Sequence, residues 1–186
     1  MYEAVTTERL VLTAPTDAEL AELHQLHSDP AVWEHLPSGR HTDLGQTAAQ
    51  LAREQASWRE HGLGSWVLRS RADPLGPLLG LAGCRWHAGP GWNLGYRLAR
   101  SAWGRGVAGE VVTAALGAAA DVAPELPVVA YLLEHNAGSR RTAERAGLRL
   151  VWRGPDVGNP DPGAIRLVYA DRPLPPRVLA AFTEQS

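Results

Sequence analysis

The feature that most constrains this 186-residue chain is a glycine-rich turn between a predicted strand and a predicted helix. Three glycines, Gly104, Gly106 and Gly109, fall within six positions. The preceding segment 92–99 alternates apolar with polar or small residues, which is the period of a half-buried strand. The following segment 111–122 is rich in alanine, as helices are. This arrangement predicts a phosphate-binding site, because amides at a helix start lack intrahelical partners and carry partial positive charge.

Two nucleotide-binding motifs share this arrangement, and the sequence argues against both. A P-loop requires a lysine after its last glycine, whereas all 18 basic residues of this chain are arginine. The segment 104–109 matches the short dinucleotide-binding pattern Gly-x-Gly-x-x-Gly, but that pattern normally lies near the start of its domain. No acidic residue that could hold a ribose follows clearly before Glu134. A dinucleotide site therefore stays open only as a minor alternative.

The segment Trp103-Gly-Arg-Gly-Val-Ala-Gly-Glu110 resembles the acyl-CoA pyrophosphate loop of the GNAT N-acetyltransferases. Their signature is Gln or Arg, two residues, Gly, one residue, and then Gly or Ala. Gly106 and Ala108 match it, while a tryptophan stands at the Gln/Arg position. Two further segments, 7–12 and 136–148, resemble the branch that contains the ribosomal-protein N-terminal acetyltransferases. The three segments occur in family order and span most of the chain.

The resemblance implies a transferase that moves an acetyl group from acetyl-CoA directly to a primary amine. The amine would belong to a protein N-terminus or to a small molecule. The partners expected are therefore acetyl-CoA and an amine acceptor, with a homodimer left open. The resemblance assigns cofactor binding to the loop and to the start of a later helix: Leu98, Trp103, Gly104, Arg105, Gly106, Val107, Ala108, Gly109, Asn136, Ser139 and Arg140.

Two catalytic groups that many relatives use are absent at the matching positions. Ala143 stands where the family often has a tyrosine that gives a proton to the departing thiolate. Asn93 stands where many relatives have a glutamate, and an amide cannot take a proton at neutral pH. These absences leave open a second function, a catalytically inactive GNAT-like module that only binds acyl-CoA.

Other residues are candidates for the missing chemistry. The resemblance places Asn136 near the pantetheine arm, and asparagine also favours the N-cap position of a helix. We expect Ser139 to donate a hydrogen bond to the leaving sulfur. Glu134 and His135 are the candidates for the general base, because they end an apolar strand just before Asn136. His87, or a chain of water molecules without a dedicated base, stays an alternative.

Composition excludes several other classes of protein. A length of 186 residues fits one domain, 1–186, whose last residues, 173–186, form a short tail. A net charge of −2 gives no bulk attraction for nucleic acid. No segment approaches the roughly 18 apolar residues of a membrane span. The N-terminus has no basic region or apolar signal core, so we expect no membrane partner and a cytoplasmic protein.

Cysteine and histidine usage predicts neither a reactive thiol nor a metal centre. Cys84 lies in an apolar run, where a buried structural thiol is the expectation. His24 and His27 are three residues apart on a predicted helix, but no cysteine or carboxylate cluster completes a metal site. We therefore expect no metal.

Periodicity and turn residues predict the order β-αα-βββ-α-β-α-ββ, a mixed α/β (α+β) fold around one largely antiparallel sheet. The resemblance implies that the central strands splay apart and admit the pantetheine arm. The acceptor pocket is expected between the two N-terminal helices, the segment 35–40 and a mobile loop at 154–163. The predicted strands are 9–13, 65–70, 78–87, 92–99, 128–133, 148–153 and 165–170. The predicted helices are 17–27 (capped by Asp17), a second one that Thr42 or Asp43 caps and that runs to about residue 60, 104–122 and 137–146.

Overall fold

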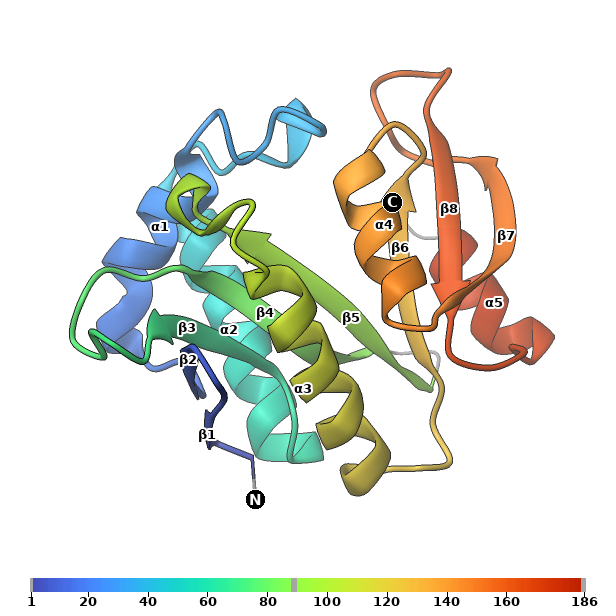
Figure 1. Ribbon diagram of the computed structural model, residues 1–186. Coiled ribbons are helices and arrows are strands. Elements are labelled where there is room, and N and C mark those ends of the chain that lie inside the picture. The colour runs from blue at the N-terminus through green and yellow to red at the C-terminus, as the bar shows by residue number, and fades with distance from the viewer. Residues whose placement is uncertain (1, 88–89, 185–186) are drawn as a thin grey trace.

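The computed structural model describes residues 2–87 and 90–184, which form eight strands and five α-helices (Figure 1). The strands are β1 (Ala4–Thr6), β2 (Leu10–Thr13), β3 (Ser65–Ser70), β4 (Gly80–His87), β5 (Gly91–Leu98), β6 (Val128–Leu133), β7 (Arg149–Pro155) and β8 (Ile165–Ala170). The helices are α1 (Leu20–Ser28), α2 (Leu44–His61), α3 (Val107–Val122), α4 (Ala137–Arg145) and α5 (Pro176–Thr183).

All these strands join one sheet in the order β1-β2-β3-β4-β5-β6-β8-β7. Each neighbouring pair is antiparallel except β5 and β6, which run parallel. In Figure 1, α3 and α4 cross in front of the sheet, while α2 and α5 lie behind it. The predicted mixed fold with a largely antiparallel sheet is therefore confirmed.

Strands β5 and β6 pair over only two residues each. Trp92 lies opposite Val128, and Asn93 lies opposite Val129. Beyond this point the two strands diverge, which can be followed in Figure 1 from their common lower end. On their outer sides they remain paired, β5 with β4 and β6 with β8. The predicted splay of the central strands is thus confirmed, and we call the space between them the gap.

The apolar core is divided between the faces of the sheet. The largest cluster packs α3 against the central strands, and it includes Cys84, which is fully buried. Burial raises the pKa of the Cys84 thiol, so the predicted structural role of this cysteine holds. Among the described residues, no helix is long and apolar enough to cross a membrane. The buried residues of α3 recur at helical spacing: Val107, Val111, Val112, Ala115, Ala118 and Ala119.

The start of the first helix differs from the prediction. Thr16, not Asp17, is the cap residue, and a single 3-10 turn, Asp17–Glu19, precedes α1. The Glu19 carboxylate accepts hydrogen bonds from the backbone and the hydroxyl of Thr16, each at 2.8 Å. The segment Thr-x-x-Glu is a capping-box pattern that the sequence displays, so this position was predictable.

Two elements were not predicted, and both are short. Strand β1 pairs with β2 at the edge of the sheet. Helix α5 forms inside the predicted tail, where Val178 and Phe182, four residues apart, are buried against Val129 and Val168. Pro176 stands at its first turn, as proline often does. A spacing of four residues places Val178 and Phe182 on the same face of α5. Because that face is apolar, the helix packs against the sheet and does not extend away from it.

The loop before β8 is shorter than predicted. Gly154 and Pro155 belong to β7 and pair with β8. Asp156 then ties the remaining loop together: its carboxylate pairs with Arg166 and accepts a 2.8 Å hydrogen bond from the Asn159 side chain. The backbone N–H of Asp156 also donates to the carbonyl of Ala164 at 2.9 Å. These bonds give the loop one defined conformation.

A cluster of histidines packs between α1, α2 and the segment that joins them. The ring of His27, which is 2% exposed, stacks on His41 with centroids 4.6 Å apart. Among the described residues, neither ring nitrogen of His27 has a hydrogen-bond partner. Thr47 Oγ1 lies 2.9 Å from Nδ1 of both His24 and His41. Burial above all, then the charges of His41, Arg97 and His24, lowers the pKa of His27 to about 3.

We predict that this buried histidine makes the protein less stable in acid. In the unfolded chain His27 binds a proton near its ordinary pKa of 6.5, whereas the folded chain excludes that proton down to about pH 3. Its contribution to stability is therefore complete above about pH 6.5 and is lost as the pH falls below that value. The loss is about 1.4 kcal/mol per pH unit at most. Urea unfolding at about pH 7 and about pH 5 measures it.

The carboxylates also titrate in this range, so the comparison needs a matched variant. His27→Phe keeps an aromatic ring beside His41 but cannot bind a proton. Its free energy of unfolding should fall less steeply with pH than that of the wild type. If the free energies of unfolding of the two proteins depend identically on pH, His27 does not contribute to the loss of stability in acid.

Candidate active site

The glycine turn joins the end of β5 to the start of α3. A 3-10 turn, Arg100–Ala102, comes first, and the tight turn 103–106 follows. Gly104 and Gly106 have φ values of +69° and +79°, in the left-handed region that residues with a Cβ rarely adopt. These two glycines turn the chain back so that α3 can begin directly at Val107.

The backbone N–H groups of this turn are available to a ligand. Among the described residues, those of positions 104–109 have no hydrogen-bond acceptor. The helix ladder starts with Glu110, whose N–H donates to the Gly106 carbonyl at 3.1 Å. Gly104, Gly106 and Gly109 are also exposed. Free amides at the positive end of a helix form an anion-binding site, so the geometry that the sequence predicted is present.

The N-terminal strand segment holds this turn in position. Glu110 Oε1 accepts hydrogen bonds from the Thr7 hydroxyl at 2.5 Å and from the Arg9 N–H at 2.8 Å. Arg9 Nη1 donates to the Arg105 carbonyl at 2.8 Å. Two of the sequence segments that resemble the acetyltransferases are therefore parts of one contact. That contact fixes the first turn of α3 and one carbonyl of the loop.

Two side chains of the loop, Trp103 and Arg105, donate hydrogen bonds to backbone carbonyls that precede it, and Arg105 adds a positive charge. Trp103 Nε1 donates to the Leu98 carbonyl at 2.9 Å, although its ring remains 44% exposed. Arg105 Nη1 donates to the Ser101 carbonyl at 3.3 Å. In the described part of the chain no carboxylate pairs with Arg105, so its charge is available to an anion.

The second predicted segment begins α4. Asn136 Oδ1 accepts a hydrogen bond from the Ser139 N–H at 3.0 Å, so Asn136 is the N-cap, as predicted. Ser139 is half-buried, and its hydroxyl has no partner among the described residues. It shares a helix face with Ala143, which packs in the core beside α3. Arg140 is exposed and forms a 3.7 Å ion pair with Glu144.

The two candidate bases differ in their surroundings. Glu134 forms a bidentate ion pair with Arg153, at 2.7 and 3.0 Å. Its hydrogen bond with Arg153 lowers the pKa of Glu134, which weakens it as a base. His135 Nε2 lies 2.8 Å from the carbonyl of His35, in the segment between α1 and α2. A carbonyl only accepts, so Nε2 carries a hydrogen, and in the neutral imidazole this leaves the lone pair on Nδ1.

The family is decided by the extent of the sequence match. Residues 9–149 match the sequence model of the acetyltransferase (GNAT) domain. This chain is a member of the GNAT acetyltransferase family.

Solved structures share the GNAT fold of this chain. A GNAT-family protein from Bordetella pertussis is 22% identical, with a TM-score of 0.76, and the match covers 91% of this chain and 99% of the other. The ribosomal L7/L12 alpha-N-protein acetyltransferase RimL, in complex with coenzyme A, is 18% identical with a TM-score of 0.73 and coverages of 90% and 97%. The microcin C7 self-immunity acetyltransferase MccE, in complex with acetyl-CoA and AMP, is 13% identical with a TM-score of 0.72 and coverages of 91% and 96%.

In this GNAT chain the open end of the gap is covered by the segment between α1 and α2. The hydrogen bond between His35 and His135 joins that segment to the end of β6. His87 instead lies opposite Gly91, where β5 begins, and its ring stacks on Phe182 with centroids 4.1 Å apart. The structure thus places His35 and His135 together and leaves His87 at the closed end.

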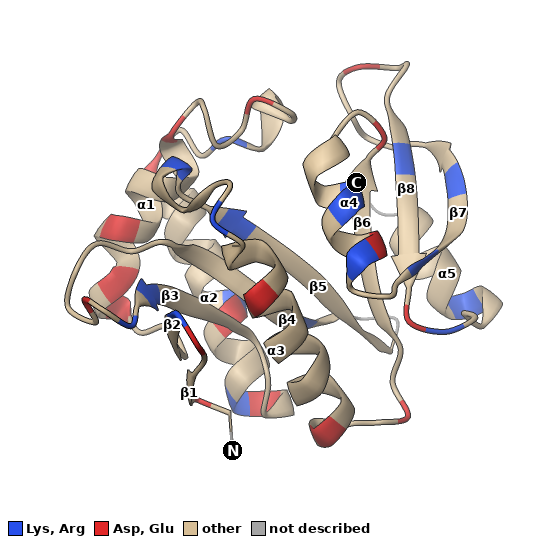
Figure 2. Cartoon of the chain, in the orientation of Figure 1, with Lys and Arg blue, Asp and Glu red and all other residues tan. Residues whose placement is uncertain are grey.

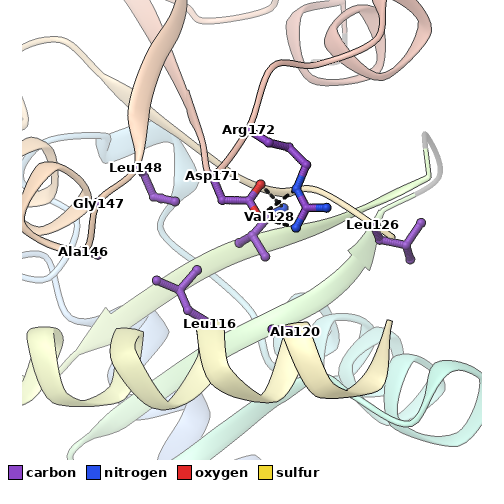
Figure 3. Close-up of a pocket in the computed structure, with 9 residues that line it drawn as sticks. All are labelled: Leu116, Ala120, Leu126, Val128, Ala146, Gly147, Leu148, Asp171 and Arg172. Carbon is purple, nitrogen blue, oxygen red and sulfur yellow. Dashed lines mark hydrogen bonds and ion pairs between the residues drawn. The ribbon is translucent and has the colours of Figure 1, made fainter. Parts of the chain in front are cut away.

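A pocket of about 170 Å³ lies at that closed end, between the second half of α3 and the sheet (Figure 3). Asp171 and Arg172 on its wall pair with each other at 2.8 Å. They also bond to the backbone of Val128 and Pro124, so their charges are satisfied within the protein. We assign this pocket to imperfect packing between α3, α4 and the sheet. Its lining residues are Leu116, Ala120, Leu126, Val128, Ala146, Gly147, Leu148, Asp171 and Arg172.

Figure 2 shows basic residues on β5, α4, β7 and β8. Within the described part of the chain, no group of three or more His, Cys, Asp or Glu residues is arranged to hold a metal ion. Arg97, on β5, was not singled out from the sequence, because a charged residue in an alternating strand ordinarily faces solvent.

We predict that Gly106→Glu abolishes CoA binding, since a carboxylate would stand over the free amides. A Cβ here would lie 2.8 Å from Arg9 Nη1, and φ of +79° strains any residue with a side chain. The variant should therefore also lose about 1–2 kcal/mol of stability. Isothermal titration with CoA, on protein shown to be folded by circular dichroism, measures the affinity.

Gly106→Gln is the matched control, because it has the same size and backbone strain without the charge. It should bind CoA more weakly than the wild type but more tightly than Gly106→Glu. Wild-type affinity in a folded Gly106→Glu protein would exclude the loop as the diphosphate site.

Proposed function

We propose that this protein transfers the acetyl group of acetyl-CoA to a primary amine. The observation that carries the proposal is the row of free amides at positions 104–109, at the start of the helix that follows the diverging strand β5. These amides would hold the diphosphate, with Arg105 as an added charge. The pantetheine arm would enter the gap and bring the thioester towards Asn136 and Ser139. The complexes of RimL with CoA and of MccE with acetyl-CoA support acetyl-CoA as the cosubstrate.

The reaction needs an amine without its proton, next to a fixed thioester. The amine nitrogen attacks the carbonyl carbon, the new C–N bond forms, and the C–S bond breaks to give an amide and CoA. In our proposal His135 Nδ1 takes the proton that the amine loses, while its Nε2–H remains bound to the His35 carbonyl. That hydrogen bond holds the imidazole at the open end of the gap.

The Glu134 carboxylate is the weaker candidate for the base. Its bidentate pair with Arg153 must break or loosen before it can accept a proton. We propose that Glu134 positions Arg153 and the end of β6, and that His135 is the base.

The departing sulfur develops negative charge, which a nearby donor would stabilise. The Ser139 hydroxyl has no partner among the described residues and lies in the first turn of α4. Tyr169, the next candidate, donates to Glu144 Oε1 at 3.0 Å and is 2% exposed. Unlike Tyr169, Ser139 would not have to break an existing hydrogen bond to reach a ligand; Tyr131, the other alternative, is 45% exposed.

The second candidate function is binding of acyl-CoA without catalysis. Ala143 favours it, because this position is buried beside α3 and carries no acid. Release of free CoA from acetyl-CoA, measured with a panel of amines and peptides, distinguishes the two functions. Acceptor-dependent release supports the transferase. CoA binding with no release over any acceptor supports the binding module.

We predict that Ser139→Ala lowers turnover by about 10- to 100-fold, with little change in the affinity for acetyl-CoA. The reason is that the hydroxyl would bond mainly to charge that develops in the transition state. Steady-state kinetics, together with titration of CoA binding, measures both quantities. Ser139→Cys, which keeps a weak donor, should recover part of the rate.

A normal rate in Ser139→Ala would show that the serine is only a surface residue of α4. The N-cap is unaffected in this variant, because Asn136 accepts from the backbone of residue 139. Unchanged thermal stability of Ser139→Ala would show that any difference in rate from the wild type does not come from a change in folding.

A further inference from the structure

Arg97, at the edge of the gap, is a cation with no carboxylate partner among the described residues. It lies on β5 four residues beyond Asn93, where pairing with β6 stops. On the neighbouring strand β4 it lies opposite Leu81, which belongs to the core cluster under α1 and α2. The alternate residues Leu94 and Leu98 face α3 instead. The Arg97 side chain therefore lies on the face of the sheet opposite to the glycine loop, where phosphates of CoA would not neutralise it.

Every direct partner of Arg97 is neutral. The guanidinium carbon lies 3.6 Å from the centroid of a Trp33 ring. Nη1 lies 3.1 Å from His35 Nε2 and 3.5 Å from the Val32 carbonyl. Nε and Nη2 donate to no described residue. The Trp33 ring and the two acceptors of Nη1 fix the plane of the guanidinium. The Nε and Nη2 groups of the same guanidinium keep their N–H donors unused.

The surrounding titratable groups supply no negative charge. Burial lowers the pKa of Arg97 to about 10, an effect that Tyr96 and Tyr131 partly oppose, so the guanidinium stays charged at neutral pH. Burial first, then the charge of Arg97, lowers the pKa of His35 to about 4. His27 and His41 also have lowered pKa values, so these rings are neutral as well.

Other arginines of the sheet that are at least half-buried have carboxylate partners. Arg69 pairs with Glu22, Arg85 with Glu54 and Arg166 with Asp156. Among the described strands, Arg97 is the exception. Keeping a desolvated charge without a partner is costly, and a bound anion would remove that cost.

Arg97 is also connected to the candidate base. The side chain of His35 accepts from Arg97, and the backbone carbonyl of the same residue holds His135. One residue thus contacts both groups. A ligand that places its amine at His135 would lie beside the residue that contacts the guanidinium.

We propose that Arg97 determines acceptor specificity by binding a carboxylate or phosphate group carried by the amine substrate. The acceptor class is then an anionic amine, with the acid group close to the amino group. This inference rests on the proposed acetyl transfer. Arg97 would donate a bidentate pair of hydrogen bonds to the anion through Nε and Nη2, as arginine commonly does with carboxylates and phosphates.

Matched pairs of acceptors test the proposal. The pairs are an amino acid and its amide, phosphoethanolamine and ethanolamine, and peptides that begin with Glu or with Gln. The wild type should favour the anionic member of at least one pair by about tenfold or more in kcat/KM. The pair that shows the preference identifies the source of the anion: free carboxylate, phosphate or peptide side chain.

Variants then assign the preference to the residue. Arg97→Gln should bring the ratio within a pair close to one, while the KM for acetyl-CoA stays unchanged. Arg97→Lys should retain part of the ratio. Arg149→Gln, at an exposed position of β7, is the control and should behave like the wild type. If Arg97→Gln does not fold, Arg97→Leu, which suits its apolar neighbours, replaces it.

Failure of this inference can be separated from failure of acetyl transfer. Equal kcat/KM values within every pair, or a preference that survives in Arg97→Gln, would overturn the role of Arg97 while leaving the transferase intact. If no amine is acetylated, calorimetry on the CoA-bound protein measures the affinity for each member of the same pairs and so tests the anion site directly. Tighter binding of the anionic member, lost in Arg97→Gln, supports the anion site. Equal binding, or no binding of either member, overturns it.

Discussion

The parallel pairing of β5 and β6 is the interaction on which the rest of the structure depends. It comprises only Trp92 with Val128 and Asn93 with Val129. At this point two strands of one sheet are joined, and past it their described residues no longer pair with each other. Each strand is secured on its other side by an antiparallel neighbour, so the sheet can remain intact while it opens. The gap is therefore a consequence of sheet topology and not of a flexible loop.

Everything proposed for the chemistry is arranged around this opening. On one face, the helix that connects β5 to β6 presents its free N–H groups, and Thr7, Arg9 and Glu110 hold its first turn. On the other face, the segment between α1 and α2 covers the open end through His35. The proposed phosphate cradle and the proposed acceptor surface thus lie on opposite faces of the same two strands, which would let two substrates approach from different sides.

Charge is distributed unevenly over these two faces. The amides of the loop carry only partial charges, which suit a diphosphate in contact with solvent. The acceptor face contains a full charge, Arg97, surrounded by histidines that burial keeps neutral. A buried cation flanked by neutral rings is selective, because an anion relieves the desolvation and a second cation does not.

The sequence determined the elements and the loop. Strands β3, β6 and β8 begin and end at the predicted residues, because apolar runs bounded by turn residues are local signals. The glycines with positive φ and the N-cap at Asn136 are also local and were predictable. Helix α5 and the Thr16 capping box left readable signals that the prediction did not use. Only the tertiary structure decided which of these residues meet, because Arg97, His35 and His135 lie far apart in the sequence and His35 contacts each of the other two. A lone arginine in an alternating strand looks like any solvent-facing residue, and the absence of its counter-ion appears only when every neighbour is in place.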